Sequence, residues 1–125
     1  MKLEYLPDGS TDHSLIRLYE FDQSEARQLR QLIESLATGD REVVALHNEA
    51  WVEPVGACCL NLRRGNRNHG IRQSRTLRFE CVLTLDGWSN VEGLLEPFCE
   101  SDTSGFQWLT HDGRVALLLS KNGKW

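Results

Sequence analysis

The strongest structural signal in the chain is residues 22–39, which read DQSEARQLRQLIESLATG. Asp22 can accept hydrogen bonds from the first free amides of a helix, and Glu25 stands where its side chain completes a capping box. Apolar residues then recur at steps of three and four, which places them on one helical face. These residues are Ala26, Leu29, Leu32, Ile33 and Leu36. Gly39 is typical of the position just past a helix end. The segment therefore predicts an amphipathic helix.

Strand signals lie on both sides of this helix. The predicted strands are residues 2–6, 14–21, 42–47, 57–63, 77–85, 106–110 and 114–120. The first two flank a turn at Pro7-Asp8-Gly9-Ser10, and the last two flank Asp112-Gly113, so both pairs predict hairpins. Residues 77–85 alternate apolar and polar side chains, as a strand does when one face packs on a core.

A second, shorter helix is predicted after Asp86-Gly87. Ser89 and Glu92 have the spacing of a capping box, and Pro97 should end or kink the helix because its missing amide breaks a helical hydrogen bond. The element order is then β-β-α-β-β-β-α-β-β. With 125 residues, the chain is expected to form a single α+β domain over residues 1–125, with a largely antiparallel sheet and two helices on one face.

Charge is distributed unevenly along the chain. No acidic residue lies between Glu53 and Glu80, and this interval carries a charge of +6. The other 8 basic and all 18 acidic residues give the remainder a charge of −10. The pattern indicates a basic loop or hairpin on an otherwise acidic domain, which is a candidate contact for an anion or an acidic partner.

The arginines of this interval are therefore the candidate binding residues. In a hairpin formed by residues 62–79 they could make paired hydrogen bonds to carboxylate or phosphate groups. The chosen set is Arg63, Arg64, Arg67, Arg72 and Arg75, with Trp51 as an apolar anchor. The hypothesis is a small non-catalytic binding or regulatory module for an acidic protein, or one that associates with itself as a homodimer. Against it stands a simpler interpretation, in which the arginines form a solvated face neutralised by Glu20, Glu42 or Glu80.

An enzyme or small-ligand protein with a site assembled from dispersed residues is the alternative. It would be favoured by a deep pocket that brings His47 or His69 beside a cysteine or a carboxylate. The four histidines show none of the compact spacings of metal ligands, and no nucleotide-binding or nucleophile motif is present. No metal and no cofactor are therefore expected.

A nucleic-acid-binding domain is the second alternative. Arginines favour phosphate contact, but the net charge of −4 and the absence of a known recognition motif argue against it. The first residues lack the apolar run of a signal peptide, and no segment is long enough to cross a membrane, so a cytoplasmic protein without membrane contact is expected.

Overall fold

The computed structural model describes residues 1–9, 14–101 and 103–125, and the predicted turn at residues 7–10 therefore lies partly outside the described residues. In chain order the elements are β1 (Lys2–Leu6), β2 (Ser14–Tyr19), α1 (Gln23–Ala37), β3 (Val43–Ala45), the 3-10 turn η1 (Leu46–Asn48), β4 (Glu53–Pro54), the 3-10 turn η2 (Val55–Ala57), β5 (Cys59–Arg64), β6 (Gly70–Arg75), β7 (Arg78–Leu83), α2 (Leu85–Leu94), α3 (Glu96–Glu100), β8 (Phe106–Thr110) and β9 (Val115–Ser120). The predicted α+β class is confirmed.

Helix α1 forms where its capping residues predicted it. Asp22 accepts a hydrogen bond from the amide of Glu25 at 2.8 Å, and the Glu25 carboxylate accepts one from the amide of Asp22 at 3.1 Å. The Glu25 carboxylate also pairs with the N-terminal ammonium group. Gly39 has a φ of 86°, the left-handed conformation expected just past the helix. The buried residues of the helix are Ala26, Leu29, Ile33 and Leu36.

The strands form one mixed sheet, so the prediction of a largely antiparallel sheet was wrong. The strand order is β3-β5-β7-β6-β9-β2-β1-β4, and β8 pairs with β9. Three pairs are parallel, namely β1 with β4, β2 with β9 and β5 with β7. The predicted hairpins β1–β2 and β8–β9 are both present. Alternation of side chains shows that a segment is a strand, but it does not choose a distant partner or its direction.

The arginine-rich segment does not form the hairpin predicted for residues 62–79. Strands β5 and β7 are parallel neighbours, and residues 65–69 cross the end of β7 so that β6 lies on its far side. Asn68 anchors this crossover, because its Oδ1 accepts hydrogen bonds from the amide and the hydroxyl of Thr84 at 2.9 and 3.1 Å. The hairpin that does form joins β6 to β7 through residues 76–77. Strand β6 escaped prediction because residues 72–75 are all polar and exposed.

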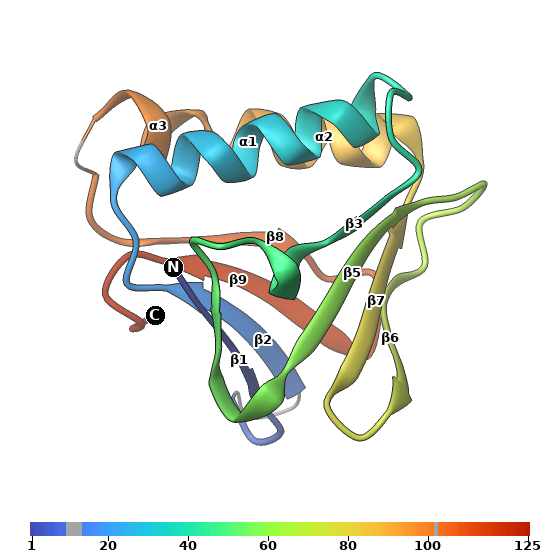
Figure 1. Ribbon diagram of the computed structural model, residues 1–125, viewed down its shortest axis with the longest axis horizontal. Helices are drawn as coiled ribbons and strands as arrows, with labels where there is room; N and C mark the ends of the chain where they lie inside the picture. The colour runs from blue at the N-terminus through green and yellow to red at the C-terminus, as the bar shows by residue number, and fades with distance from the viewer. Residues whose placement is uncertain (10–13, 102) are drawn as a thin grey trace.

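The sheet curls back on itself below the helices (Figure 1). Strand β4 lies at one end of the strand order and β5 lies second from the other end. Only five peptide steps connect Pro54 to Cys59, and an extended chain covers about 18 Å in five steps. The two ends of the sheet must therefore approach each other. Accordingly, the rings of Tyr5 in β1 and Phe79 in β7 lie 4.6 Å apart between centroids.

Helix α2 begins earlier than predicted. The hydroxyl of Thr84 accepts a hydrogen bond from the amide of Gly87 at 3.1 Å, which makes Thr84 the capping residue. Asp86-Gly87 therefore lies inside the helix, and the predicted start at Ser89 was wrong. Thr84 can take this role because it is the single residue between the end of β7 at Leu83 and the start of α2 at Leu85.

Helix α2 ends before Pro97, as predicted, and a new short helix begins there. Helix α2 ends at Leu94, and α3 starts at Glu96 with Pro97 in its first turn, where no helical hydrogen bond needs its amide. The described residues thus contain three α-helices instead of two, and all three cover one face of the sheet (Figure 1).

The core lies between these helices and the inner face of the sheet. Its largest fully buried side chain is Trp88 of α2, whose Nε1 donates a hydrogen bond to the carbonyl oxygen of Arg63 at 3.0 Å. Phe79, Cys81 and Leu83 of β7 are buried, as their alternation predicted. Through Trp88 the helix layer therefore contacts the backbone of β5 from the inner side of the sheet. The arginine side chains of β5 and its neighbours lie on the other side.

Candidate functional site

Several of the predicted arginines lie on the outer side of β5, β7 and β6. Asn61, Glu80 and Arg72 occupy neighbouring positions on these three strands, and Arg78 lies opposite Arg75. Side chains two positions apart along a strand share one face of a sheet. A register shift between Gln73 and Arg75 places Arg75 opposite Arg78 and so on the same side. The arginines on this outer surface, called the arginine face from here on, are Arg63, Arg72, Arg75 and Arg78.

The fold neutralises one of these four charges. Nε of Arg63 lies 2.8 Å from a carboxylate oxygen of Glu80, and this hydrogen bond raises the pKa of Arg63. Arg72, Arg75 and Arg78 are exposed, and none of them forms an ion pair with any residue that the structure describes. Of the three carboxylates expected to compensate the arginines, Glu20 instead pairs with Lys2. Three unpaired positive charges therefore remain on the arginine face.

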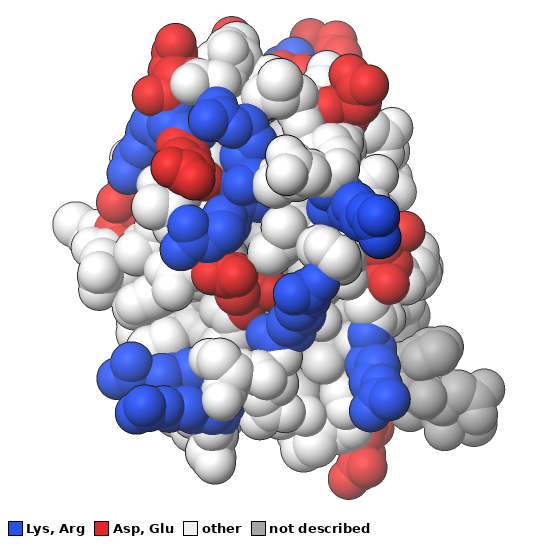
Figure 2. All heavy atoms as spheres, turned by 90° about the vertical axis from the view of Figure 1, so that its right-hand side faces the viewer, with Lys and Arg blue, Asp and Glu red and all other residues white. Residues whose placement is uncertain are grey.

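The two other predicted arginines lie at the opposite end of the strands. Arg64 ends β5 and Arg67 lies in the crossover, whereas Arg78 is opposite Cys59 at the start of β5. At about 3.3 Å per residue the two ends of β5 are about 16 Å apart. Figure 2 shows separate basic groups on this side of the molecule, with acidic side chains between them. The arginines predicted to bind a partner therefore do not form one continuous patch.

The tip of the β6–β7 hairpin combines like charge with backbone strain. Arg75 and Arg78 occupy directly opposed positions, an arrangement that destabilises a sheet by up to about 1 kcal/mol. Leu77 in the turn has a φ of 60°, which costs a residue with a side chain about 1–2 kcal/mol. Such costs are typical of segments kept for binding or catalysis. Arg78 was not among the predicted site residues, although it belongs to the same acid-free interval.

Trp51 has a packing role that the sequence did not indicate. Its side chain is half-buried against the core, and its carbonyl oxygen accepts a hydrogen bond from the N-terminal ammonium group at 3.0 Å. No cation–π contact joins it to an arginine within the described ranges. Its use as an apolar anchor for a partner stays a prediction.

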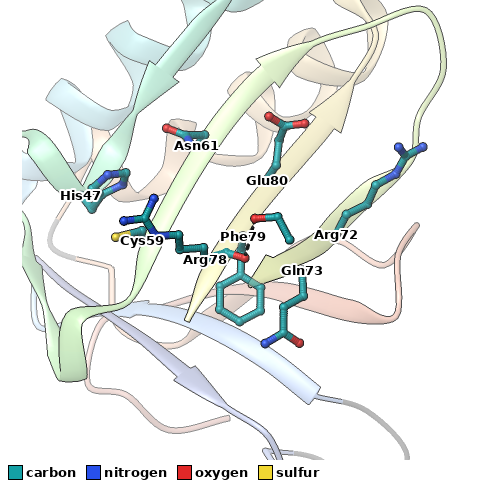
Figure 3. A pocket seen from close by; sticks show the side chains of 9 residues that line it. His47, Cys59, Asn61, Arg72, Gln73, Arg78, Phe79 and Glu80 are labelled. Carbon is teal, nitrogen blue, oxygen red and sulfur yellow. Dashed lines mark hydrogen bonds between the residues drawn. The ribbon is translucent and has the colours of Figure 1, made fainter. Parts of the chain in front are cut away.

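A cavity of about 380 Å³ opens on the arginine face. Its lining includes His47, Cys59, Asn61, Arg72, Gln73, Ser74, Arg78 and Glu80. Figure 3 shows the side chain of Arg78 reaching across β5 toward Cys59 and His47, while Arg72 extends on the other side of Glu80. The volume is at the small end of the range for ligand sites, and the polar lining suits a small anion.

The backbone of β5 holds the His47 ring through Leu60. Its Nδ1 lies 3.1 Å from the amide nitrogen of Leu60 and 3.3 Å from the carbonyl oxygen of the same residue. Nδ1 accepts from the amide when the neutral ring carries its proton on Nε2, and it donates to the carbonyl oxygen when the proton is on Nδ1. The turn η1 places this ring beside β5 just after β3 ends, so His47 provides a hydrogen bond that a longer β3 would have made. Sequence reasoning had no signal for this pairing.

Of the described cysteines, Cys59 alone lines the cavity. Burial raises the pKa of Cys58 to about 12 and also raises the pKa of Cys81, so both thiols stay protonated at neutral pH. Cys59 lines the cavity, but its Sγ donates to the carbonyl oxygen of Ala57 at 3.6 Å. A hydrogen bond from the nucleophile to a base is one common means of activation, and no such bond joins Cys59 to His47 in the described part of the chain.

No group of three or more histidine, cysteine, aspartate or glutamate side chains is placed to hold a metal ion within residues 1–9, 14–101 and 103–125. In the same residues, no helix is long and apolar enough to cross a membrane.

Comparison with known proteins assigns no family. No protein-family model matches the chain, and neither a curated protein nor a solved structure matches it at a significant level. A function therefore has to be inferred from the arginine face, its cavity and the remaining surfaces.

Proposed function

We propose that this chain is a non-catalytic binding or regulatory module that contacts an acidic protein partner through the arginine face. The supporting observation is that Arg72, Arg75 and Arg78 are exposed and form no ion pair with any described residue. A guanidinium group can bind a carboxylate through two parallel hydrogen bonds. A partner carboxylate that draws the Arg78 side chain back toward Arg75 would bind both guanidinium groups.

The cavity supports a second candidate, which is a small carboxylate or phosphate ligand. His47, Cys59 and Glu80 meet in this cavity beside Arg78, which is the combination that would favour a site built from dispersed residues. The amide of Asn61, and the Nε2–H of His47 in the tautomer that accepts from Leu60, are donors of the kind that orient a small anion. The contribution of this cavity is binding and orientation, because Cys59 lacks a hydrogen-bonded base.

A hexaglutamate peptide serves as the probe for the first candidate. The double variant Arg75→Ser, Arg78→Ser should weaken its binding about fivefold or more at low salt, which is about 1 kcal/mol. A matched control, Arg41→Ser with Lys124→Ser, removes the same charge from exposed positions outside the arginine face and should change affinity less than about twofold. Equal losses in both variants would show that only net charge matters, and the arginine face would not be a site.

Two further outcomes separate the other hypotheses. Binding of a single-stranded oligothymidylate that weakens steeply with added salt would favour a nucleic-acid-binding domain. A homodimer seen by sedimentation velocity, and lost in the Arg75→Ser, Arg78→Ser variant, would favour self-association through this face.

The cavity is tested with glutarate as a small dicarboxylate. Amide resonances of Cys59, Asn61 and Gln73 should shift on titration, and Asn61→Leu should abolish the shifts by filling the cavity. Asn66→Leu is the matched control, since Asn66 is exposed in the crossover and does not line the cavity. Shifts that persist in Asn61→Leu would place the ligand elsewhere.

A further inference from the structure

Strand β8 has an open edge on the side of the molecule covered by α2. It pairs with β9 and with no other strand of the described chain. An open edge presents unpaired amide and carbonyl groups, and other chains can pair with such an edge as an added strand. Figure 1 shows β8 running below the helix layer, so its free edge is next to a helix.

The hydrogen-bond pattern shows which groups point to this edge. The amide of Lys121 donates to the carbonyl oxygen of Gly105 at 3.1 Å, one position before Phe106. Hydrogen-bonded and non-bonded pairs alternate along an antiparallel ladder, so the next residue that bonds to β9 is Gln107. Phe106 and Trp108 therefore direct their amide and carbonyl groups away from β9.

The carbonyl oxygen of Trp108 confirms this direction. It accepts a hydrogen bond from Nε2 of Gln107 at 3.0 Å, a contact made by a neighbouring side chain instead of a strand. Gln107 pairs with Leu119 through its backbone, so its side chain can move away without breaking the sheet. The edge is thus occupied by a group that an incoming strand can displace.

A groove of about 470 Å³ lies between this part of β8 and α2. Val91 and Leu94 of α2 and Trp108 and Leu109 of β8 give it apolar walls. Its polar lining consists of Asn68, Asp86, Asn90, Thr110, His111 and Asp112. On the outer side of β8, Phe106 is exposed and its ring centroid lies 6.5 Å from that of Trp108.

The charge of the groove is opposite to that of the arginine face. No lysine or arginine lines it, and Asp86 and Asp112 are exposed and form no ion pair with a described residue. An occupant with positive side chains would compensate both carboxylates. Apolar side chains in alternate positions would pack against Val91 and Leu94, because successive side chains of a strand point to opposite sides.

We infer that this groove is a second binding site, separate from the arginine face, which takes an extended peptide of alternating basic and apolar residues as an added strand on β8. The backbone groups of Phe106 and Trp108 hydrogen-bond the peptide, and the carboxylates of Asp86 and Asp112 attract its positive charge. Lysines on the outer side lie over the aromatic rings of β8, where cation–π attraction adds to the contact. The inference does not depend on the function proposed for the arginines.

The probe is the peptide acetyl-KVKVKVK-amide, titrated into the full chain by calorimetry. Two N-methylated versions, one methylated at its valines and one at its lysines, provide the backbone controls. A strand pairs through alternate residues, so one version should lose about tenfold or more in affinity and the other should keep most of it. No binding of the parent peptide, or equal affinity of both methylated versions, would overturn the inference.

Hydrogen exchange and charge variants locate the bound peptide. The amide protons of Phe106 and Trp108 should exchange rapidly in the free protein and become protected on binding, whereas that of Gln107 should be protected in both states. The variant Asp86→Asn, Asp112→Asn should weaken binding about fivefold or more. The matched variant Asp8→Asn, Asp40→Asn removes two exposed charges elsewhere and should have less than a twofold effect. Unchanged exchange at Phe106 and Trp108 would rule out strand addition.

Discussion

Replacing Arg75 by glutamate should stabilise the fold while it weakens binding of an acidic partner. Arg75 and Arg78 are directly opposed at the tip of the β6–β7 hairpin, and both are exposed. The variant Arg75→Glu turns a repulsive cross-strand pair into an attractive one. Most substitutions destabilise a folded domain, so a gain at this position would show that the arginine is kept for a reason other than stability.

The expected gain follows from the geometry of the pair. The Arg78 side chain extends across β5 in the structure (Figure 3) but is exposed and free to turn back toward position 75, where charges on opposed side chains come within about 6 Å and two unit charges in water interact by at most about 0.7 kcal/mol. Reversing the sign changes the energy by about 1.4 kcal/mol without salt, and screening at 0.1 M reduces this to about 0.8 kcal/mol. The midpoint of thermal unfolding should then rise by about 3–5 °C. Arg75→Gln, which only removes the repulsion, should give about half of the gain.

Urea unfolding at 20 mM and at 1 M NaCl is the assay for this prediction. The gain should be largest at low salt and should nearly vanish at 1 M, where the Debye length is about 3 Å. Arg41→Glu is the matched control, since Arg41 is exposed in the loop after α1. The reasoning is refuted if Arg75→Glu is no more stable than the parent at low salt, or if Arg41→Glu gains as much.

Four further predictions concern stability and thiol chemistry. Asp22→Ala should lower the free energy of unfolding by about 1 kcal/mol in urea, because the capping box of α1 loses its acceptor; no loss would mean that the cap contributes nothing. Trp88→Phe should cost about 2–4 kcal/mol, since it opens a void and leaves the carbonyl oxygen of Arg63 without its indole donor; a change below about 1 kcal/mol would contradict this packing. Above pH 9 the free energy of unfolding should fall, because unfolded thiols ionise near 9 whereas folded Cys58 keeps its proton up to about 12; Cys58→Ala should flatten this slope. At pH 8 a water-soluble thiol reagent should label Cys59 alone in the native protein and all 4 cysteines in guanidinium, and rapid labelling of Cys58 would show that its burial is wrong.

The local elements were predictable because their signals are local. The capping box of α1, the alternation in β7 and the signals for the two hairpins act over fewer than ten residues. The capping box and both strand pairings were confirmed, and β7 spans most of the segment predicted for it. The start of α2 was predicted five residues late, because Thr84 and Ser89 are both good capping residues and only the end of β7 selects between them. Strand β6 carried no apolar alternation, so only its pairing with β7 reveals it.

The candidate site was less predictable than the elements. The acid-free interval drew attention to the arginines, but it gave no means of knowing that Arg63 would pair with Glu80 or that Arg78 would face Arg75. The role of His47 depends on a hydrogen bond to the backbone of β5 across 13 residues. The groove beside β8 joins α2 to a strand that follows it by more than ten residues, and no spacing in the sequence brings these segments together.

By itself, the sequence determined the α+β class, the amphipathic helix after Asp22 and the concentration of positive charge between Glu53 and Glu80. These properties depend on neighbouring residues along the chain and on composition, which are present before any tertiary contact forms. Only the tertiary structure decided three other features. These are the parallel pairing of β5 with β7, the placement of the arginines at opposite ends of these strands, and the open edge of β8. They depend on which distant strands become neighbours, and that choice minimises the free energy of the whole core instead of any one segment.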